Sequence, residues 1–510
     1  MCSPLSIFIT PIRFNVKAQR SSGILLHPTS FPGRYGIGDL GPQAYRFLDF
    51  LHETGTRLWQ ILPLGPTGYG DSPYQSFSAF AGNPYLISPD LLLEENLLHP
   101  DDLKEDLDFD ADSVDFGRII GWKLSLLERA FIRFAREPEL ATTREQYAAF
   151  CVDTATWLDD YALFMAIKEA HGGGSWAGWP PELRNREEAA IAEACEKFSE
   201  AIERFKFYQF IFFRQWNALR AYAKEKNIQV VGDIPIFVSF DSSDVWSNPE
   251  LFYLDDKKVP TVVAGVPPDY FSPTGQLWGN PIYKWSVHKE SGYAWWIERF
   301  QASFDIVDIV RLDHFRGFSG YWEIPADSLT AETGRWVPGP GADFFDAMKA
   351  ALKELPIIAE DLGEITPDVF ELRDQFNLPG MKILQFAFSD ESNPFLPHHY
   401  PENCVAYTGT HDNDTARGWY AAAPEHNRDF ARRYMSVDGN DISWDLIRTL
   451  WHSKANWVVA QMQDLLNLDS DARMNFPGRL GGNWDWRMRE DALDDALKDK
   501  LRALNEATDR

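Results

Sequence analysis

The stretch Val310-Arg311-Leu312-Asp313-His314 ends the strand-like run 306–310 with a carboxylate. The same arrangement recurs at Ile358-Ala359-Glu360-Asp361 after the run 356–359, and at Thr410-His411-Asp412-Asn413-Asp414 after the run 404–407. Apolar runs of this length are typical of strands buried in a parallel sheet. Catalytic groups of a (β/α)₈ barrel lie where its strands end, so three such acids can meet in one pocket. Two carboxylates are the minimum for chemistry at a glycosidic bond, and this chemistry is our first hypothesis.

Strand-like and helical patterns alternate along most of the chain, which predicts an α/β fold, a (β/α)₈ TIM barrel with helical and loop insertions between strands. We expect strands at 22–27, 58–64, 228–231, 306–310, 356–359, 380–388, 404–408 and 457–465. Helices are predicted at 42–54, where Pro42 begins the first turn and Gly55 follows the end, and at 205–226.

Two regions interrupt the alternation of strands and helices. A mostly helical insertion is predicted at about 86–204, and a smaller insertion at about 241–293. Both belong to one catalytic barrel that we expect to span residues 21–510. Insertions in the loops of a barrel shape its substrate groove, so we expect both to border the site.

Composition narrows the classes of partner. The 510 residues include 76 acidic and 49 basic side chains, a net charge of −27, which repels nucleic acid and anionic lipid. No run approaches the roughly 18 apolar residues of a membrane span. A neutral sugar is not excluded, and some of the 19 tryptophans could stack on sugar rings, although we expect most of them in the core.

The cysteines and the N-terminus bear on the location of the protein. The chain has four cysteines that are far apart in the sequence: Cys2, Cys151, Cys195 and Cys404. This spacing indicates a reducing compartment and no disulfides. Residues 1–20 carry three basic side chains and no acid, and we expect them to form a disordered N-terminal extension. The prediction is a cytoplasmic protein, with a plastid as the alternative if the extension is a transit-peptide remnant.

The segment Gly36-Ile37-Gly38-Asp39-Leu40-Gly41 matches the GxGxxG pattern of dinucleotide-binding folds. In those folds the strand turns directly into the helix, whereas here about eight residues separate them. Pro42 also removes an N–H that would otherwise bind a pyrophosphate. We therefore predict a glycine turn and no nucleotide cofactor.

Neighbouring charges suggest different roles for the first two acids. Arg311 and Asp313 are two apart on a strand and share a face, so the guanidinium favours the ionised carboxylate that a nucleophile needs. A structural ion pair is the alternative. Glu360 ends an apolar run, where desolvation raises a carboxyl pKa and suits a general acid. Asp361 faces the opposite side. The pattern alone does not show which of Glu360 and Asp361 is the catalytic acid. For either residue, the alternative to a catalytic role is to cap the N-terminus of the next helix.

Asp412 and Asp414 share a face if their strand continues, with His411 beside them. A His–Asp pair can bind a metal, and it can equally hydrogen-bond the hydroxyls of a sugar. No third clustered histidine supports a metal. We therefore favour the sugar role and predict no metal and no cofactor.

Longer blocks resemble the glucanotransferases of the amylomaltase type, glycoside hydrolase family 77. These blocks are 68–85, 232–238, 265–271 with 275–281, and the three acid stretches, and the resemblance runs from Gly23 to about Arg487. It implies a retaining 4-alpha-glucanotransferase that acts on alpha-1,4-glucans and maltooligosaccharides, as a monomer or weak homo-oligomer. Asp313 would be the nucleophile, Glu360 the acid/base and Asp412 a transition-state stabiliser, with the two reacting carboxyls roughly 5–5.5 Å apart.

The resemblance also implies a set of substrate-binding residues: Tyr74, Asp233, Gln276, Trp278, Arg311, His411 and Asn483, with Tyr69 as a secondary glucan contact. The loop 265–281 is the candidate lid that keeps water from the intermediate. Three alternatives stay open: an amylase-like hydrolase, a debranching enzyme for α-1,6 bonds, and a glycan-binding protein without catalysis. The intact set of acids argues against the last.

Overall fold

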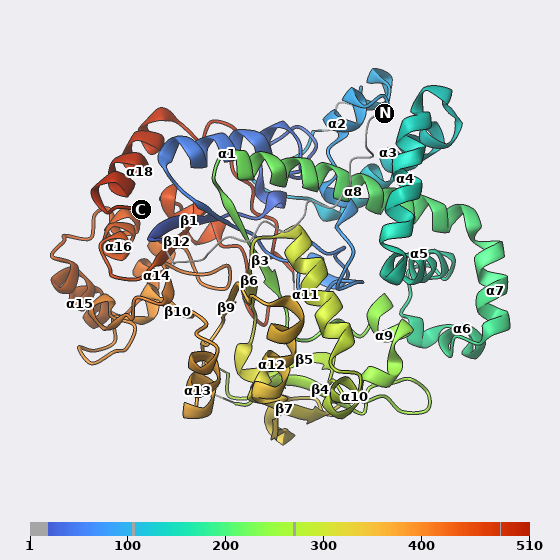
Figure 1. Ribbon diagram of the computed structural model, residues 1–510. Helices are drawn as coiled ribbons and strands as arrows, with labels where there is room; N and C mark the ends of the chain where they lie inside the picture. Colours follow the sequence, from blue (N-terminus) through green and yellow to red (C-terminus); the bar gives the residue numbers. More distant parts are fainter. Residues whose placement is uncertain (1–18, 105–107, 269–271, 480) are drawn as a thin grey trace.

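A computed structural model describes residues 19–104, 108–268, 272–479 and 481–510 of the chain. Almost all of the predicted N-terminal extension lies outside these residues. Eight parallel strands close into a barrel in the order β1-β12-β11-β10-β9-β6-β3-β2. They are β1 (Ser21–Leu25), β2 (Leu58–Gln60), β3 (Gln229–Ile234), β6 (Ile309–Leu312), β9 (Ile357–Ala359), β10 (Gly380–Ile383), β11 (Cys404–Tyr407) and β12 (Trp457–Gln461). The predicted (β/α)₈ TIM barrel is confirmed, with helices arranged around the strands (Figure 1).

All eight predicted barrel strands are present, but several predictions extend too far, among them the run 58–64, whose strand ends at Gln60. The run 306–310 begins inside helix α11 (Ala294–Ile306), the run 380–388 passes into a 3₁₀ turn at Leu384–Phe386, and the run 457–465 ends as helix α17 (Met462–Leu465). Buried strands and buried helical turns are equally apolar, so hydrophobicity does not mark the boundary between them. Pairing with the neighbouring strands decides where each barrel strand stops.

Helix α1 (Pro42–Thr54) has the predicted bounds. Gly55 follows it with a φ of 78°, a left-handed conformation that glycine adopts without steric cost. Further helices pack around the barrel or follow its strands: α8 (Ser199–Glu225), α12 (Gly341–Leu352), α13 (Pro367–Gln375), α14 (Ala416–Ala422), α15 (Glu425–Met435), α16 (Ile442–Trp451) and α18 (Asp495–Ala507).

Between β2 and β3 the described chain is helical. Its helices are α2 (Pro89–Glu94), α3 (Phe116–Arg136), α4 (Ala141–Asp153), α5 (Ala155–Ala170), α6 (Pro181–Arg184) and α7 (Glu188–Lys197), most of them on the right in Figure 1. The fully buried Lys123 of α3 donates to the backbone oxygen of Ile87 and lies 3.8 Å from the carboxylate of Asp39. We propose that these helices form the insertion predicted at 86–204, attached to the barrel loops through such contacts.

A second sheet was not predicted from the sequence. It is antiparallel, in the order β5-β4-β7-β8, with strands β4 (Val262–Val266), β5 (Gln276–Pro281), β7 (Gly320–Pro325) and β8 (Arg335–Pro338). The short helices α9 (Ser243–Ser247) and α10 (Trp285–Glu290) flank the first two strands along the chain. The sheet combines the segment before β6 with the segment after it, and such long-range pairing leaves no local pattern. Strand β5 carries the predicted site residues Gln276 and Trp278.

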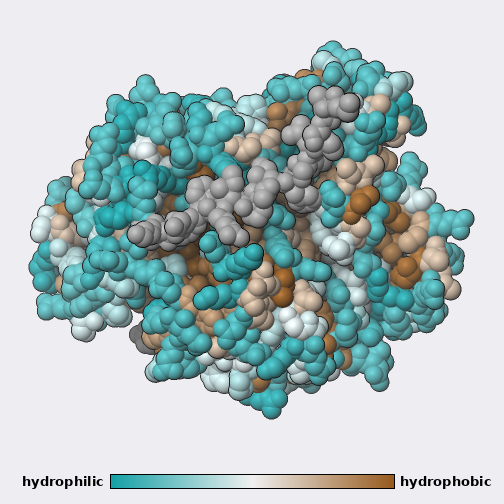
Figure 2. Space-filling view, viewed as in Figure 1, coloured by the Kyte–Doolittle hydropathy of each residue, from teal (hydrophilic) through white to brown (hydrophobic). Residues whose placement is uncertain are grey.

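The face shown in Figure 2 is mostly hydrophilic, with apolar residues in patches. Large aromatic side chains fill the interior instead: Trp59, Trp216 and Trp296 are among the fully buried residues. Within the described ranges, no helix has both the length and the apolar character needed to cross a membrane.

Candidate active site

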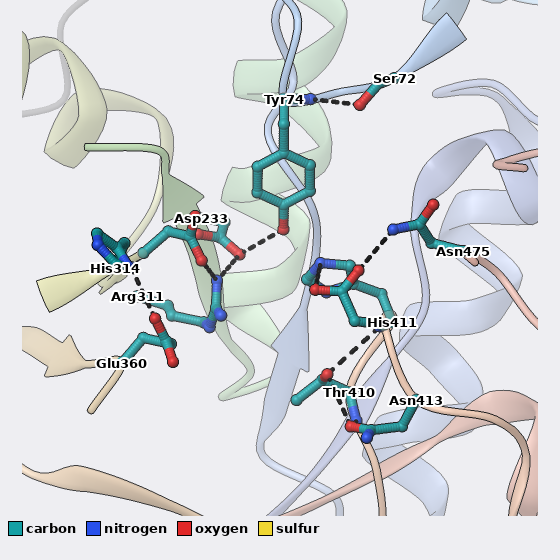
Figure 3. Close-up of polar contacts among 12 residues, drawn as sticks. Ser72, Tyr74, Asp233, Arg311, His314, Glu360, Thr410, His411, Asn413 and Asn475 are labelled. Carbon is teal, nitrogen blue, oxygen red and sulfur yellow. Dashed lines mark hydrogen bonds and ion pairs between the residues drawn. The ribbon is translucent and has the colours of Figure 1, made fainter. Parts of the chain in front are cut away.

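The predicted acids lie at the carboxyl ends of barrel strands, of which β3, β6 and β9 are adjacent and β11 is separated from β9 by β10. Asp313 follows β6, Glu360 follows β9, and the segment with His411 and Asp412 follows β11, while Asp233 lies near the end of β3. In Figure 3, Asp233, Arg311 and Glu360 approach from one side and His411 from the other. The topology therefore brings together acids that are up to 179 positions apart, from Asp233 to Asp412.

Arg311 forms ion pairs with two of the acids of the site. Its Nη1 lies 2.7 Å from Oδ2 of Asp233 and 2.9 Å from Oδ1 of Asp313, and its Nε lies 3.4 Å from Sδ of Met381. The predicted shared face of Arg311 and Asp313 is correct. The Arg311 side chain is only 5% exposed and that of Asp313 is 29% exposed, so solvent and substrate reach the carboxylate more easily than the guanidinium.

Tyr74 contacts both Asp233 and His411. Its hydroxyl donates to Oδ2 of Asp233 at 2.9 Å, and its ring stacks on His411 with the centroids 5.1 Å apart (Figure 3). Burial raises the pKa of Asp233 to about 7, against the opposing effect of the Arg311 charge. Oδ1 of Asp233 is buried and has no hydrogen-bond partner among the described residues.

Glu360 is held by backbone amides. Its Oε2 accepts from the N–H of His314 at 2.7 Å and its Oε1 from the N–H of Leu362 at 3.0 Å. Burial raises the pKa of Glu360 to about 8, the positive charge of Arg311 opposes this, and the negative charge of Asp313 adds to it. Glu360 is therefore protonated at neutral pH and has a proton to donate.

The structure separates the roles of Glu360 and Asp361, which the sequence pattern left open. Asp361 forms an ion pair with Arg373 of α13 and accepts from the backbone N–H of Met381 at 2.7 Å. Residue 366 occupies the N-cap of α13, so neither acid caps that helix. Asp361 is a structural ion-pair partner, and Glu360 is the acid near Arg311.

The segment after β11 turns instead of continuing as a strand, so Asp412 and Asp414 do not share a strand face. Asp414 accepts from Oγ of Ser470 and from the N–H of Thr415, both at 2.8 Å. Asp412 accepts from Nδ2 of Asn475 at 2.6 Å, and its side chain is 47% exposed. Oδ2 of Asp412 also lies 3.4 Å from Nε2 of His411.

Two residues that hold Asp412 were missed by the sequence analysis. Asn475 binds its carboxylate, and Arg473 donates to its backbone oxygen at 2.6 Å. Both follow Asp412 by about sixty positions in an irregular loop, where no pattern of spacing marks them.

Burial lowers the pKa of the nearby His411, which keeps its ring neutral. No group of three or more His, Cys, Asp or Glu side chains in the described ranges is placed to hold a metal ion.

The remaining predicted site residues lie on strand β5 and in loops. The indole of Trp278 packs edge-to-face on His314, with the centroids 4.8 Å apart, and donates to Oε1 of Gln276 at 3.1 Å. Tyr69 is 62% exposed. The amide of Asn483 bonds within its own loop, accepting from the N–H of Phe476 and donating to an oxygen of that loop, so its predicted groove contact stays a prediction.

A (β/α)₈ barrel with acids at several strand ends around a buried arginine defines the class of carboxylate-dependent barrel enzymes that act on glycosidic bonds. Comparisons with known proteins identify the family within this class. Residues 26–493 match the family model described as 4-alpha-glucanotransferase. The chain therefore belongs to this family, and the resemblance predicted from its sequence blocks is confirmed.

Individual relatives agree with the family. The 4-alpha-glucanotransferase of Thermus thermophilus is 52% identical over 500 residues, which cover 96% of this chain and 99% of that protein. The chloroplastic/amyloplastic 4-alpha-glucanotransferase of Solanum tuberosum is 45% identical over 96% of this chain and 85% of its own length. The structure of the amylomaltase from Streptococcus agalactiae in complex with acarbose matches with a TM-score of 0.94 and 44% identity, over 96% of this chain and 100% of that chain. The protein is an enzyme, not a binding protein without catalysis.

Proposed function

We propose that this 4-alpha-glucanotransferase moves a segment of an alpha-1,4-glucan to the 4-hydroxyl of another glucan or of glucose by a retaining double displacement. One observation supports this most directly: Arg311 pairs with the accessible Asp313, while burial raises the pKa of Glu360 to about 8. A carboxyl group paired with the arginine and a second one whose pKa is raised beside the same arginine are the two groups that this mechanism needs.

In the first step, the Asp313 carboxylate attacks the anomeric carbon of the donor. The bond between that carbon and the bridging oxygen breaks, and the oxygen takes the proton of Glu360, so the shortened glucan leaves as a neutral alcohol. The product is a glucosyl ester of Asp313. Its formation requires the two carboxyls to lie on opposite sides of the reacting bond, roughly 5–5.5 Å apart.

In the second step, the 4-hydroxyl of an acceptor glucan attacks the same carbon. Glu360, now ionised, takes the hydroxyl proton, and the ester bond to Asp313 breaks. Both carboxyls return to their starting states, and two inversions retain the configuration at the anomeric carbon. Asp412, His411 and Asp233 are proposed to hold the hydroxyls of the reacting glucose, and Tyr74 to lie against its ring.

Maltotriose tests the proposal. Incubation with the purified enzyme should give glucose and a ladder of longer maltodextrins, while the number of reducing ends stays constant. Products limited to glucose and maltose with a rising number of reducing ends would replace this proposal with the amylase-like hydrolase. A glucan with α-1,6 branches serves as the control for debranching, and we expect its branch points to stay intact.

The protonation state of Glu360 predicts the alkaline limb of the pH profile. Glu360 must carry its proton to donate it, and its pKa is raised to about 8, so kcat/KM for maltotriose should be level up to that pH. Above it, kcat/KM should fall by about tenfold per pH unit as the acid ionises. Initial rates between pH 6 and 10 measure this, and Glu360→Gln should be far less active with no such limb. The same limb in that variant would assign the proton to another group.

Trp278 is proposed to help keep water from the glucosyl ester. Strand β4 and strand β5 of the predicted lid 265–281 are described, and residues 269–271 between them are not. Trp278→Ala should raise the ratio of hydrolysis to transfer, because an uncovered ester reacts with water as well as with the acceptor. Leu277→Ala is the matched control, since Leu277 is its neighbour on β5, is 40% exposed and points to the other face. Equal ratios in the two variants would remove Trp278 from this role.

The location of the enzyme and its assembly rest on the sequence alone. A cytoplasmic enzyme, or a plastidial one as in the Solanum tuberosum relative, stays a prediction. The same holds for a monomer or weak homo-oligomer.

A further inference from the structure

Strand β8 presents an indole to solvent at the edge of the second sheet. Trp336 is 41% exposed, the largest exposed fraction of any tryptophan in the described ranges. Strand β8 pairs with β7 alone, and Trp336 lies opposite Trp322 in that pair. One exposed apolar side chain is ordinary on a protein surface. Trp336 differs from such a residue because its ring is held in place by two buried or half-buried neighbours.

The first neighbour is Arg316, which covers one face of the indole. Its guanidinium carbon lies 3.9 Å from the centroid of the Trp336 ring, an attractive contact between a cation and an aromatic face. Arg316 is only 7% exposed, and its Nη1 donates to the backbone oxygen of Glu364. The guanidinium is therefore fixed, and the solvent-exposed area of Trp336 lies on the rest of the ring.

The second neighbour is Trp322 of β7. The two indoles meet edge-to-face, with centroids 5.3 Å apart and an interplanar angle of 69°. Nε1 of Trp322 donates to the backbone oxygen of Ala331 at 2.8 Å, and a Cβ atom at Gly334 would collide with that nitrogen. Trp322 is thus held by the chain between β7 and β8. A ring that is already fixed loses little conformational entropy when a ligand stacks on it.

The contacts of Trp336 lead to both reacting acids. Arg316 follows Asp313 by three positions, so their Cα atoms are at most about 11 Å apart. Glu364, which accepts from Arg316, follows Glu360 by four positions. In Figure 1, strands β4 and β7 of the second sheet appear below the barrel strands β6 and β9. The exposed indole therefore adjoins the turns at the mouth of the candidate active site.

We propose that Trp336 is a stacking platform for a glucose unit of a long alpha-1,4-glucan, outside the reacting pocket. The proposal rests on the proposed function, because its occupant is the substrate of that reaction. Such a polymer repeats one unit, so one part of it can lie in the pocket while another lies on the surface. The C–H groups of a sugar ring can pack on the electron-rich face of an indole. A glucan is neutral, so the net charge of −27 does not oppose its binding.

The platform is separate from the predicted secondary contact at Tyr69. The ring of Tyr69 lies 6.0 Å from Nζ of Lys168, a residue of α5 in the helical region between β2 and β3. Trp336 belongs instead to the second sheet and packs on the turn after Asp313. Two contacts on one polymer add to its apparent affinity because the second forms within a complex that already exists.

Binding is measured by electrophoresis in native gels that contain amylose, with the Asp313→Asn background to keep the amylose intact. Trp336→Leu keeps an apolar cover for Arg316 but removes the ring, and the apparent Kd for amylose should rise about two- to tenfold. Trp336→Phe keeps a smaller ring and should lose less. Ile132→Ala is the control, since Ile132 is 40% exposed but lies on α3 and has no ring, and its Kd should equal that of the background.

Kinetics with Asp313 intact show whether the effect belongs to long glucans. In Trp336→Leu, KM for amylose should rise by a factor similar to that of the Kd. Its kcat/KM for maltotriose should stay at the wild-type value, because Trp336 touches none of the reacting groups in this scheme. Trp336→Met takes the place of Trp336→Leu if the leucine variant does not fold, with the same expected results.

Three outcomes would overturn the proposal. Unchanged retardation by amylose would leave the ring as a cover for Arg316 only, and an equal fall of kcat/KM on both substrates would place its effect on the turn after Asp313. Loss of a dimer on size exclusion, with unchanged retardation, would assign the ring to contact with a second copy of the chain. Failure of the proposed function is distinguishable, because the wild-type enzyme would then hydrolyse maltotriose while amylose still retarded it.

Discussion

Asp313→Asn should lower kcat/KM for transfer from maltotriose by about 10⁴- to 10⁶-fold, the order of loss when catalytic groups are removed from an enzyme that forms a covalent intermediate. The amide has the shape of the carboxylate but is a poor nucleophile, so the glucosyl ester does not form. Arg311 keeps its ion pair with Asp233 at 2.7 Å, so the fold should persist. Glucose release measures the loss, and circular dichroism verifies the fold.

An added nucleophile tests whether Asp313 itself attacks the sugar. In Asp313→Gly, azide can enter the space left by the carboxylate and attack the anomeric carbon of α-maltosyl fluoride, which needs no acid to expel its leaving group. Attack from that face predicts a β-glycosyl azide, the inverted product. Asp374→Asn, which changes an acid that is 64% exposed, should transfer normally and form no azide adduct. Near-normal transfer by Asp313→Asn, or an α-azide, would assign the nucleophile elsewhere.

Arg311→Met should destabilise the protein by about 3–5 kcal/mol, because it leaves a buried carboxylate without its counter-charge. The Asp233 side chain is completely buried at 0% exposure, and Arg311 is its ion-pair partner at 2.7 Å. Transfer should fall as well, since Asp313 loses the same partner at 2.9 Å. Urea unfolding measures the free energy, and Arg335→Met is the control. Arg335 is 77% exposed in its pair with Glu323, and such surface pairs contribute about 0–1 kcal/mol.

The loss in Arg311→Met should depend on pH. Burial raises the pKa of Asp233 to about 7 even beside Arg311, and without the guanidinium the folded-state pKa rises further above the unfolded value. The folded state then binds the proton more tightly than the unfolded state, so stability falls as pH rises towards and through that pKa. The variant should be closer to wild type at pH 5 than at pH 8, and Asp233→Asn should restore part of its stability. Equal losses at both pH values would show that lost packing, and not the unpaired charge, causes the effect.

Much of the architecture follows from local sequence. Helix α1 begins at Pro42 and ends before Gly55 as predicted, because proline suits a first turn and glycine a left-handed end. The barrel strands are recognisable because strands buried on both faces are continuously apolar. Their ends carry Asp313 and Glu360, so the position of the candidate catalytic residues was predictable before any tertiary contact was known.

Other features depend on contacts between distant segments. The sheet β5-β4-β7-β8 joins segments on both sides of β6, and no short window of sequence records that pairing. Which of two adjacent acids faces the site was decided by Arg373, which pairs with Asp361 from the next helix. Asn475 reaches Asp412 across 63 positions.

The sequence by itself determined the kind of fold, the strand ends at which acids occur, and the family. These features depend on periodicity, on the backbone limits of proline and glycine, and on long blocks of residues, all of which are local. The tertiary structure alone decided the protonation of Glu360, the turn of Asp414 away from Asp412, and the contact of Trp278 with His314. Burial and the neighbouring charges set these properties, and both are produced by segments that meet only when the barrel closes.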